Sequence, residues 1–217
     1  MPPPAIHASM TPPYYSCSAF YYGCSVTGVT TRKDQVLDAA IRVLGTRGTR
    51  QLTHRAVDAE ARLPQGSTSN YFRNRDALVA GVLDRLVTQD EQAWGLFSAD
   101  LANVTLTLDT FTDALAQFVD ELAATARTAT LARYAIFLEA AHHEHLREQI
   151  DTRRHRLQSW GAPWLRRLGS PRPEHDFAAL RSLLDGLLLH QCTQPSAEFD
   201  PTVPVRALLD GLSRRWS

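Results

Sequence analysis

The sequence predicts an all-α protein, in which an N-terminal three-helix domain with a helix-turn-helix precedes a helical bundle. Apolar residues recur every three to four positions over residues 31–46 and 74–92, and again in five segments after residue 107. Alternation typical of a strand never extends beyond a few residues. Glycine and proline gather between the periodic segments, where helices are joined.

Composition narrows the class of protein. The 217 residues include 23 basic and 23 acidic side chains, and 44% of the chain is hydrophobic, as in globular proteins. No apolar run approaches the roughly 20 residues that a membrane span needs. The three cysteines, Cys17, Cys24 and Cys192, are too few and too irregular for a disulfide framework or a zinc module. We therefore expect a cytoplasmic protein with no membrane partner.

Residues 1–30 differ from the rest, because no charged side chain precedes Arg32 and prolines recur. This composition predicts a disordered tail. Alternatively, the natural start lies later, at Met10 or near Val29. The segment lacks the basic start and apolar core of a secretory signal, and an arm entering the minor groove of DNA would require Arg or Lys.

The first helix is expected over residues 31–46, with Val36, Ala40 and Leu44 on its apolar face. Thr31 and Asp34 have the spacing of a capping box, with Asp in place of Glu. We expect this helix to brace the elements that follow.

A helix-turn-helix is expected next, because Pro64 separates two short helical segments, residues 53–61 and 65–72. Thr53 is suited to cap the first segment. The second is rich in small uncharged polar residues and poor in helix formers, so its composition does not serve helix stability. Short donors and acceptors do suit base edges in a major groove, which indicates a reader helix.

Nine basic and five acidic residues lie between Arg32 and Asp76, a local excess of four positive charges in a neutral chain. Such cations hold phosphates, while base contacts specify sequence. We predict that the DNA-binding residues are Arg32, Lys33, Thr53, Arg55, Gln65, Ser67, Thr68, Ser69, Asn70, Tyr71 and Arg75. Of these, we expect Gln65, Ser67, Ser69 and Asn70 to face the bases, and Thr53, Arg55, Tyr71 and Arg75 to hold phosphates.

Residues 31–78 resemble the TetR-type one-component transcriptional regulators. The resemblance rests on Ala39-Ala40, Leu52-Thr53, Ala61, Leu63, Gly66-Ser67, Tyr71-Phe72 and residues 74–78, and beyond these it extends only by length and helical character. Three positions depart from the family pattern: Arg62 replaces a usual glycine, Asp58 a usual alanine, and Ser69 a usual aromatic residue. The first two alter the expected turn and packing. The third changes a DNA contact, so the operator sequence cannot be carried over.

Asn74 is suited to cap a long helix ending near Gln92, which would connect the DNA-binding domain (31–78) to the body (79–217). Further helices are expected over residues 108–125, 130–141, 145–168, 175–191 and 204–215. A bundle of this kind can hold a ligand between its helices. Candidate ligand-binding residues are Trp94, Phe97, Phe111, Phe118, Tyr134, Phe137, Trp160 and Trp164, for which ordinary core packing is the alternative, together with Glu139 in an apolar stretch.

The last two helices are strongly apolar, so we expect them to pair with the same helices of a second subunit. The family resemblance implies the same location for a dimer interface. The candidate interface residues are Leu180, Leu183, Leu184, Leu187, Leu188, Leu208 and Leu212, and burial within one subunit is the alternative.

No catalytic motif is present: GxSxG, P-loop, Rossmann and HExxH patterns are all absent. The one metal-like cluster is residues 142–145, where only His142 and His145 have helical ligand spacing. We expect no catalytic residue, no metal and no cofactor. The leading hypothesis is a repressor that binds a palindromic operator as a homodimer and is released by a small-molecule effector. The alternatives are an activator or architectural factor without a ligand, and a helical metalloenzyme using His142 and His145.

Overall fold

The computed structural model describes residues 31–216, so the expected disordered tail lies outside the described residues. Within that range the chain is helical and has no strand, which confirms the all-α class. The elements are α1 (Arg32–Arg47), the 3-10 turn η1 (Thr49–Gln51), α2 (His54–Glu60), α3 (Ser67–Tyr71), α4 (Arg75–Ala102), α5 (Leu108–Ala124), α6 (Arg127–Ala140), α7 (Glu144–Arg167), α8 (Pro173–Thr193) and α9 (Thr202–Ser213).

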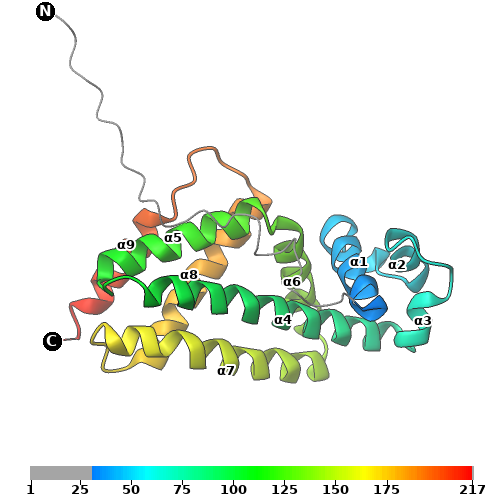
Figure 1. Ribbon diagram of the computed structural model, residues 1–217, viewed down its shortest axis with the longest axis horizontal. Coiled ribbons are helices and arrows are strands. Elements are labelled where there is room, and N and C mark those ends of the chain that lie inside the picture. Colours follow the sequence, from blue (N-terminus) through cyan, green and yellow to red (C-terminus); the bar gives the residue numbers. More distant parts are fainter. Residues whose placement is uncertain (1–30, 217) are drawn as a thin grey trace, which may run out of the picture.

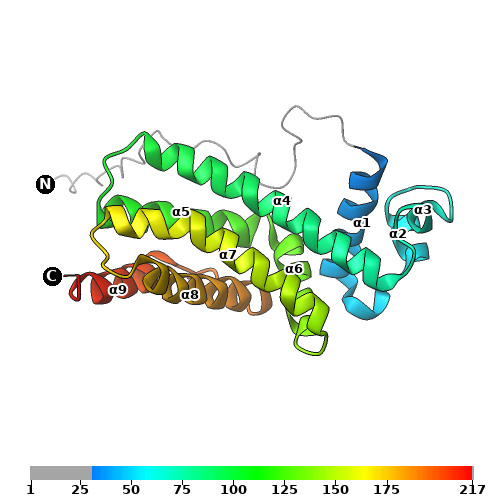
Figure 2. The same ribbon diagram turned by 90° about the horizontal axis from the view of Figure 1, so that it is seen from below.

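The molecule is elongated, and α1, α2 and α3 gather at one end of it (Figure 1). Helix α4 begins beside them and runs along the bundle formed by α5 to α9. Seen from below, α8 and α9 lie on the face of the bundle opposite α4 (Figure 2). None of the helices within residues 31–216 has the length and apolar character that a membrane crossing requires.

The predicted caps place the helix starts correctly. Thr31 Oγ1 accepts a hydrogen bond from Asp34 N (3.1 Å), and Thr31 N donates to Asp34 Oδ2 (3.1 Å), which is the predicted capping box. Asn74 Oδ1 accepts from Ala77 N (2.9 Å) at the start of α4. The end of α4 was predicted wrongly: the helix continues past Gln92 to Ala102. The reason is that Ala93, Trp94, Phe97 and Leu101 extend its buried face.

Two hydrophobic cores divide the interior. The first combines buried residues of α1, α2 and the first half of α4 with α6 and the start of α7, including Ala132, Ile136 and Leu146. The second joins the rest of α4 to α5, α7, α8 and α9. A boundary after residue 78 therefore divides α4 near its start and separates the helix-turn-helix from part of its own core.

Helix α6 packs closely on α1. A Cβ added at Gly45 of α1 would lie 2.0 Å from the carbonyl oxygen of Thr128 in α6, so only glycine permits this approach. The helix-turn-helix domain is thus seated directly on a helix of the bundle.

Candidate functional site

The helix-turn-helix has the predicted Pro64 break with a strained turn before it. Helix α2 is capped by Thr53, whose Oγ1 accepts from Ala56 N (3.2 Å). The chain turns at Arg62, which has a positive φ of 55°, a conformation that favours glycine. Gly66, with φ of 94°, leads directly into α3. Arg62, which replaces the family's usual glycine, therefore keeps the backbone conformation that favours glycine.

Asp58 is a structural residue of this motif. It is buried, and its Oδ1 accepts hydrogen bonds from Thr68 N (2.7 Å) and Thr68 Oγ1 (2.5 Å), while its Oδ2 accepts from Gly66 N (2.7 Å). Burial raises the pKa of Asp58, but the hydrogen bonds from Thr68 and Gly66 outweigh it and leave this pKa below its ordinary value. Asp58, which replaces the alanine usual in the family, thus holds the start of α3 in place.

The same geometry corrects the prediction that Thr68 contacts DNA. Its side chain is 0% exposed and bonded to Asp58, so it faces the interior of the motif. Thr68 lies on the inward side of a five-residue helix whose other face is open.

The predicted base-reading residues lie at the surface of this motif. Gln65, Ser69 and Asn70 are exposed and Ser67 is half-buried, and Tyr71, a predicted phosphate contact, is also exposed. The hydroxyls of Ser67 and Ser69 donate to the carbonyls of Pro64 (2.6 Å) and Gly66 (2.7 Å) in the described conformation. Their oxygens keep lone pairs for a donor on DNA. The face is polar and uncharged, and hydroxyl and amide side chains of this kind can form hydrogen bonds with base edges.

The other predicted DNA contacts of α1 and α2 lie at the surface. Arg32, Lys33, Thr53 and Arg55 are exposed, and Lys33 Nζ lies 5.9 Å from the centre of the Phe72 ring. Arg42 and Arg47 are instead paired with Glu60. His54 is half-buried and its Nε2 donates to the carbonyl of Phe72 (2.8 Å), which ties α2 to the segment after α3.

Arg75, a predicted phosphate contact, has a partner within the protein. Its guanidinium forms a bidentate ion pair with Glu139 of α6, and its Nη2 also donates to the carbonyl of Thr49 (3.3 Å). The hydrogen bond from Arg75 lowers the pKa of Glu139. Glu139 was expected in the ligand site and is absent from the cavity wall. It joins the bundle to the first residue of α4.

A cavity of about 530 Å³ lies inside the bundle, within the range of small-molecule sites. Its walls come from α4, α5, α6, α7 and α8. Residues of both hydrophobic cores contribute, for example Ala140 from the first and Phe177 from the second. The cavity therefore lies where the two cores meet.

Three of the predicted ligand-binding residues, Trp94, Phe118 and Phe137, line this cavity. The other predicted residues lie outside the cavity wall, so their prediction was wrong. Phe97 and Phe111 are buried behind the wall, where Phe97 packs against Trp94 at 5.1 Å between ring centres. The hydroxyl of Tyr134 donates to the Asp185 carbonyl (2.9 Å). The second core also takes up Trp160 and Trp164.

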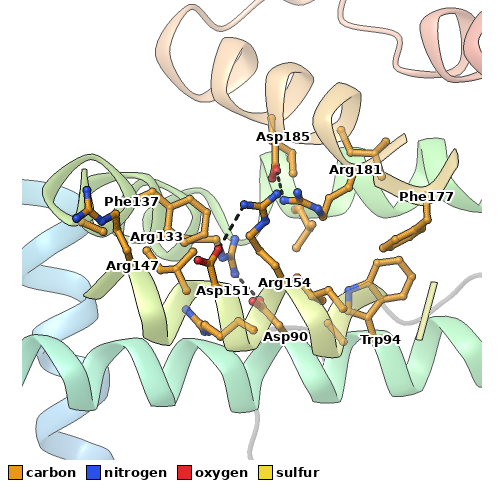
Figure 3. A pocket seen from close by; sticks show the side chains of 18 of the residues that line it. Asp90, Trp94, Arg133, Phe137, Arg147, Asp151, Arg154, Phe177, Arg181 and Asp185 are labelled. Atoms are coloured by element: carbon orange, nitrogen blue, oxygen red, sulfur yellow. Dashed lines mark hydrogen bonds and ion pairs between the residues drawn. The ribbon is translucent and has the colours of Figure 1, made fainter. Parts of the chain in front are cut away.

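The charged part of the lining was not predicted from the sequence. The close view shows aspartate and arginine side chains gathered around the cavity (Figure 3). Most are ion-paired with one another: Arg133 with Asp90, Arg154 with Asp151 (3.4 Å), and Arg181 with Asp185 (3.2 Å). Arg147 and Arg153 also line the cavity.

One of these residues was detectable from spacing. Leu146, Ile150, Arg153 and Leu157 are four, three and four residues apart, so Arg153 falls in the apolar stripe of α7. A basic residue in such a stripe faces the interior, and Arg153 is 8% exposed.

The candidate dimer residues divide into two groups. Leu180, Leu184, Leu188 and Leu212 are buried within the subunit, so the prediction that they form an intersubunit surface is wrong. Their place on the inner face of α8 and α9 explains this. Leu183, Leu187 and Leu208 are half-buried and reach the surface.

The histidines of residues 142–145 are exposed at the junction of α6 and α7. Among residues 31–216, no three His, Cys, Asp or Glu side chains are placed to share a metal ion.

Comparisons with solved structures identify the fold. A transcriptional regulator from Rhodococcus sp. RHA1 is 19% identical with a TM-score of 0.70, over 85% of this chain and 97% of that one. The multidrug binding protein EbrR, solved with ethidium, is 26% identical with a TM-score of 0.61, over 85% and 99%. A TetR-family member from Streptomyces coelicolor is 28% identical with a TM-score of 0.59, over 83% and 97%.

Family models cover both parts of the chain, whereas no curated protein sequence matches it. Residues 36–82 match the bacterial regulatory proteins of the tetR family. Residues 106–215 match the tetracyclin repressor-like C-terminal domain. The chain therefore belongs to the TetR family of transcriptional regulators, in which the helix-turn-helix binds DNA.

Proposed function

We propose that this protein is a cytoplasmic homodimeric repressor that binds a palindromic operator and leaves it when a small molecule occupies the bundle cavity. The observation that carries the proposal is the position of α6. Phe137 and Ala140 of this helix line the cavity. Ala132 and Ile136 belong to the core that it shares with α1.

Two further contacts connect α6 to the DNA-binding domain. The first is the backbone approach between Gly45 and Thr128. The second is the ion pair between Arg75 and Glu139. A ligand that moves α6 by a small amount would therefore shift α1 and the start of α4. Such a ligand acts only if it binds the DNA-released arrangement more tightly than the DNA-bound one.

A ligand-bound relative supports the role of the cavity. EbrR, 26% identical to this chain, is described as a multidrug binding protein and was solved with ethidium. This chain has a similar fold and contains a cavity of about 530 Å³. The cavity favours a ligand-responsive regulator over an architectural factor without an effector.

The homodimer would use the outward faces of α8 and α9. Val203 is 66% exposed and Leu189 42% exposed on these helices. A Cβ added at Gly186 or Gly211 would meet nothing within 4 Å, so a second subunit could approach closely there. Half-buried Leu187 extends the apolar surface. Two subunits joined on this face would form a self-complementary four-helix interface.

Subunit mass in solution tests the interface. Val203→Asp and Gly186→Glu should convert the dimer to monomer, because each places a charge in the proposed contact. Leu138→Asp is the control, since Leu138 on α6 is equally apolar and 74% exposed. A monomeric wild-type protein, or loss of the dimer in the Leu138→Asp control alone, would contradict the proposal.

Selection from a random duplex library tests the operator. We expect palindromic sequences with half-sites about one helical turn, or a multiple, apart. Asn70→Ala should relax the preference at one position of each half-site and cost about 1–3 kcal/mol of binding free energy. Asn103→Ala, at the far end of α4, should change neither the sequence preference nor the binding free energy. Enrichment without symmetry would reject the dimeric repressor. Binding that no small molecule alters would favour the architectural factor.

A further inference from the structure

We propose that the cavity accepts a small organic acid with an apolar body and that Arg153 binds its carboxylate. The inference rests on the proposed function, because it assigns the class of effector to the same cavity. It begins from the burial of a charged side chain.

Arg153 projects from α7 into the interior and is 92% buried. Its Nη2 is buried and has no hydrogen-bond partner among the residues that the structure describes. No ion pair within residues 31–216 involves this guanidinium, although other arginines of the wall have carboxylate partners. A buried charge without a partner carries a large desolvation penalty.

Arg153 nevertheless stays charged. Burial lowers its pKa to about 10, partly offset by the nearby Asp90 carboxylate. The guanidinium therefore remains protonated at neutral pH and cannot reduce the penalty by losing its proton. The carboxylates of Asp90, Asp84 and Glu91 favour its charge from beyond ion-pair distance, and an anion entering the cavity would add a closer negative charge.

The wall has five arginines and three aspartates, and its buried part is left with one cation that forms no ion pair among the described residues, which favours a single negative charge on the buried end of the ligand. The three ion pairs of the cavity, formed by Asp90, Asp151 and Asp185 with arginines, are each neutral. Arg153 is the buried cation that remains, while Arg147 is exposed at the end of α7 nearest α6. A carboxylate carries one charge and matches the two-pronged guanidinium, whereas a phosphate monoester brings nearly two.

The rest of the wall sets the body of the ligand. Apolar side chains face the same space from α4, α5, α6 and α8, among them Trp94, Phe118, Phe137, Phe177 and Leu184. Aromatic rings of this kind suit an aromatic or aliphatic group of moderate size.

A matched charge series tests the class of ligand. We would measure binding of 2-naphthylacetate, 2-naphthylacetamide and 2-naphthylethylammonium by calorimetry, and repeat the series with decanoate, decanamide and decylammonium. In at least one series the acid should bind best and the ammonium worst. Absence of acid binding in both series, or equal binding of acid and amide, would overturn the proposal.

Variants of Arg153 test the residue. Arg153→Met should weaken binding of the acid about 10- to 100-fold and remove its preference over the amide, the effect expected for a hydrogen-bonded charge. Arg153→Lys should retain part of the preference. Arg156→Met on the same helix is the control, because Arg156 is exposed and outside the cavity wall. Unchanged acid preference in Arg153→Met would overturn the assignment.

A measurement without ligand provides an independent check. Removing an unpartnered buried charge should raise the melting temperature, so we expect Arg153→Met and Arg153→Gln to melt above the wild type. Lower melting temperatures for both would show that Arg153 is satisfied inside the protein. Operator binding separates the two proposals: if the acid binds through Arg153 without releasing DNA, the ligand class stands and the regulatory function fails.

Discussion

Asp58 of α2 caps α3 from outside that helix, with its Oδ1 accepting hydrogen bonds from both N (2.7 Å) and Oγ1 (2.5 Å) of Thr68. Helix α3 has five residues, and its own N-cap residue, Gly66, supplies no side-chain acceptor. Free amides at a helix start require acceptors. The carboxylate of a preceding helix thus fixes the orientation of the reader helix.

Replacement of Asp58 by alanine should therefore destabilise the protein by about 1–3 kcal/mol, because the buried amide and hydroxyl of Thr68 and the partly buried amide of Gly66 lose their acceptor. Urea unfolding followed by circular dichroism measures this difference. Asp84→Ala is the matched control, since Asp84 is exposed on α4. Equal midpoints for the two variants would show that α3 does not depend on this cap.

The same carboxylate predicts a pH dependence. Hydrogen bonds from Thr68 and Gly66 outweigh burial and hold the pKa of Asp58 below its unfolded value. The stabilisation is therefore fully present above the unfolded pKa of about 4 and is lost as the pH falls through the lower folded pKa. Asp58→Asn keeps an acceptor without a charge. The stability advantage of the wild type over this variant should shrink below about pH 4, and a constant difference from pH 7 to pH 3 would contradict the assignment.

Local chemistry explains which parts of the fold and site were predictable. The caps at Thr31, Thr53 and Asn74 act within three residues, so sequence spacing reveals them. The Asp58–Thr68 contact joins residues ten positions apart across a turn. It directs the Thr68 side chain toward the interior of the motif instead of toward DNA, as was predicted. No periodicity rule contains that information.

The cavity shows the same distinction. Apolar periodicity identified the helices and three of the aromatic residues in the wall. It could not tell Phe118 in the wall from Phe111 behind it, because both lie on the buried face of α5 and the packing of other helices decides. Whether the paired arginines face the cavity depends in the same way on which helices pack together.

Two turn residues with positive φ, Arg62 and Gly66, should respond to substitution with opposite changes in stability. The positive φ of Arg62 costs a side-chain-bearing residue about 1–2 kcal/mol, whereas glycine adopts it freely. Arg62 is exposed, so Arg62→Gly removes this cost without opening a cavity. Glycine also gives the unfolded chain more conformational freedom, which offsets part of the gain, so the free energy of unfolding should rise by roughly 0.5 kcal/mol. Gly66→Ala, at a φ of 94°, should lower it by about 1 kcal/mol. Thermal unfolding measures both, and destabilisation by Arg62→Gly would show that its side chain holds the turn.

The Arg75–Glu139 ion pair predicts a change in DNA affinity, because the guanidinium cannot serve Glu139 and a phosphate fully at once. If Arg75 contacts phosphate in the complex, Glu139→Gln should raise affinity for all DNA sequences several-fold. Arg75→Gln should weaken binding uniformly and reduce the salt slope by about 1. Fluorescence anisotropy at several salt concentrations measures both effects.

Glu148→Gln is the control for that experiment, since it makes the same change in net charge at an exposed position of α7. General electrostatic attraction would raise the affinity of both glutamine variants equally. A gain confined to Glu139→Gln would instead show that the bundle competes with DNA for Arg75. The two domains would then be coupled through one guanidinium, because a ligand that holds Glu139 closer to α4 would keep Arg75 from DNA, which is the direction that release from the operator requires.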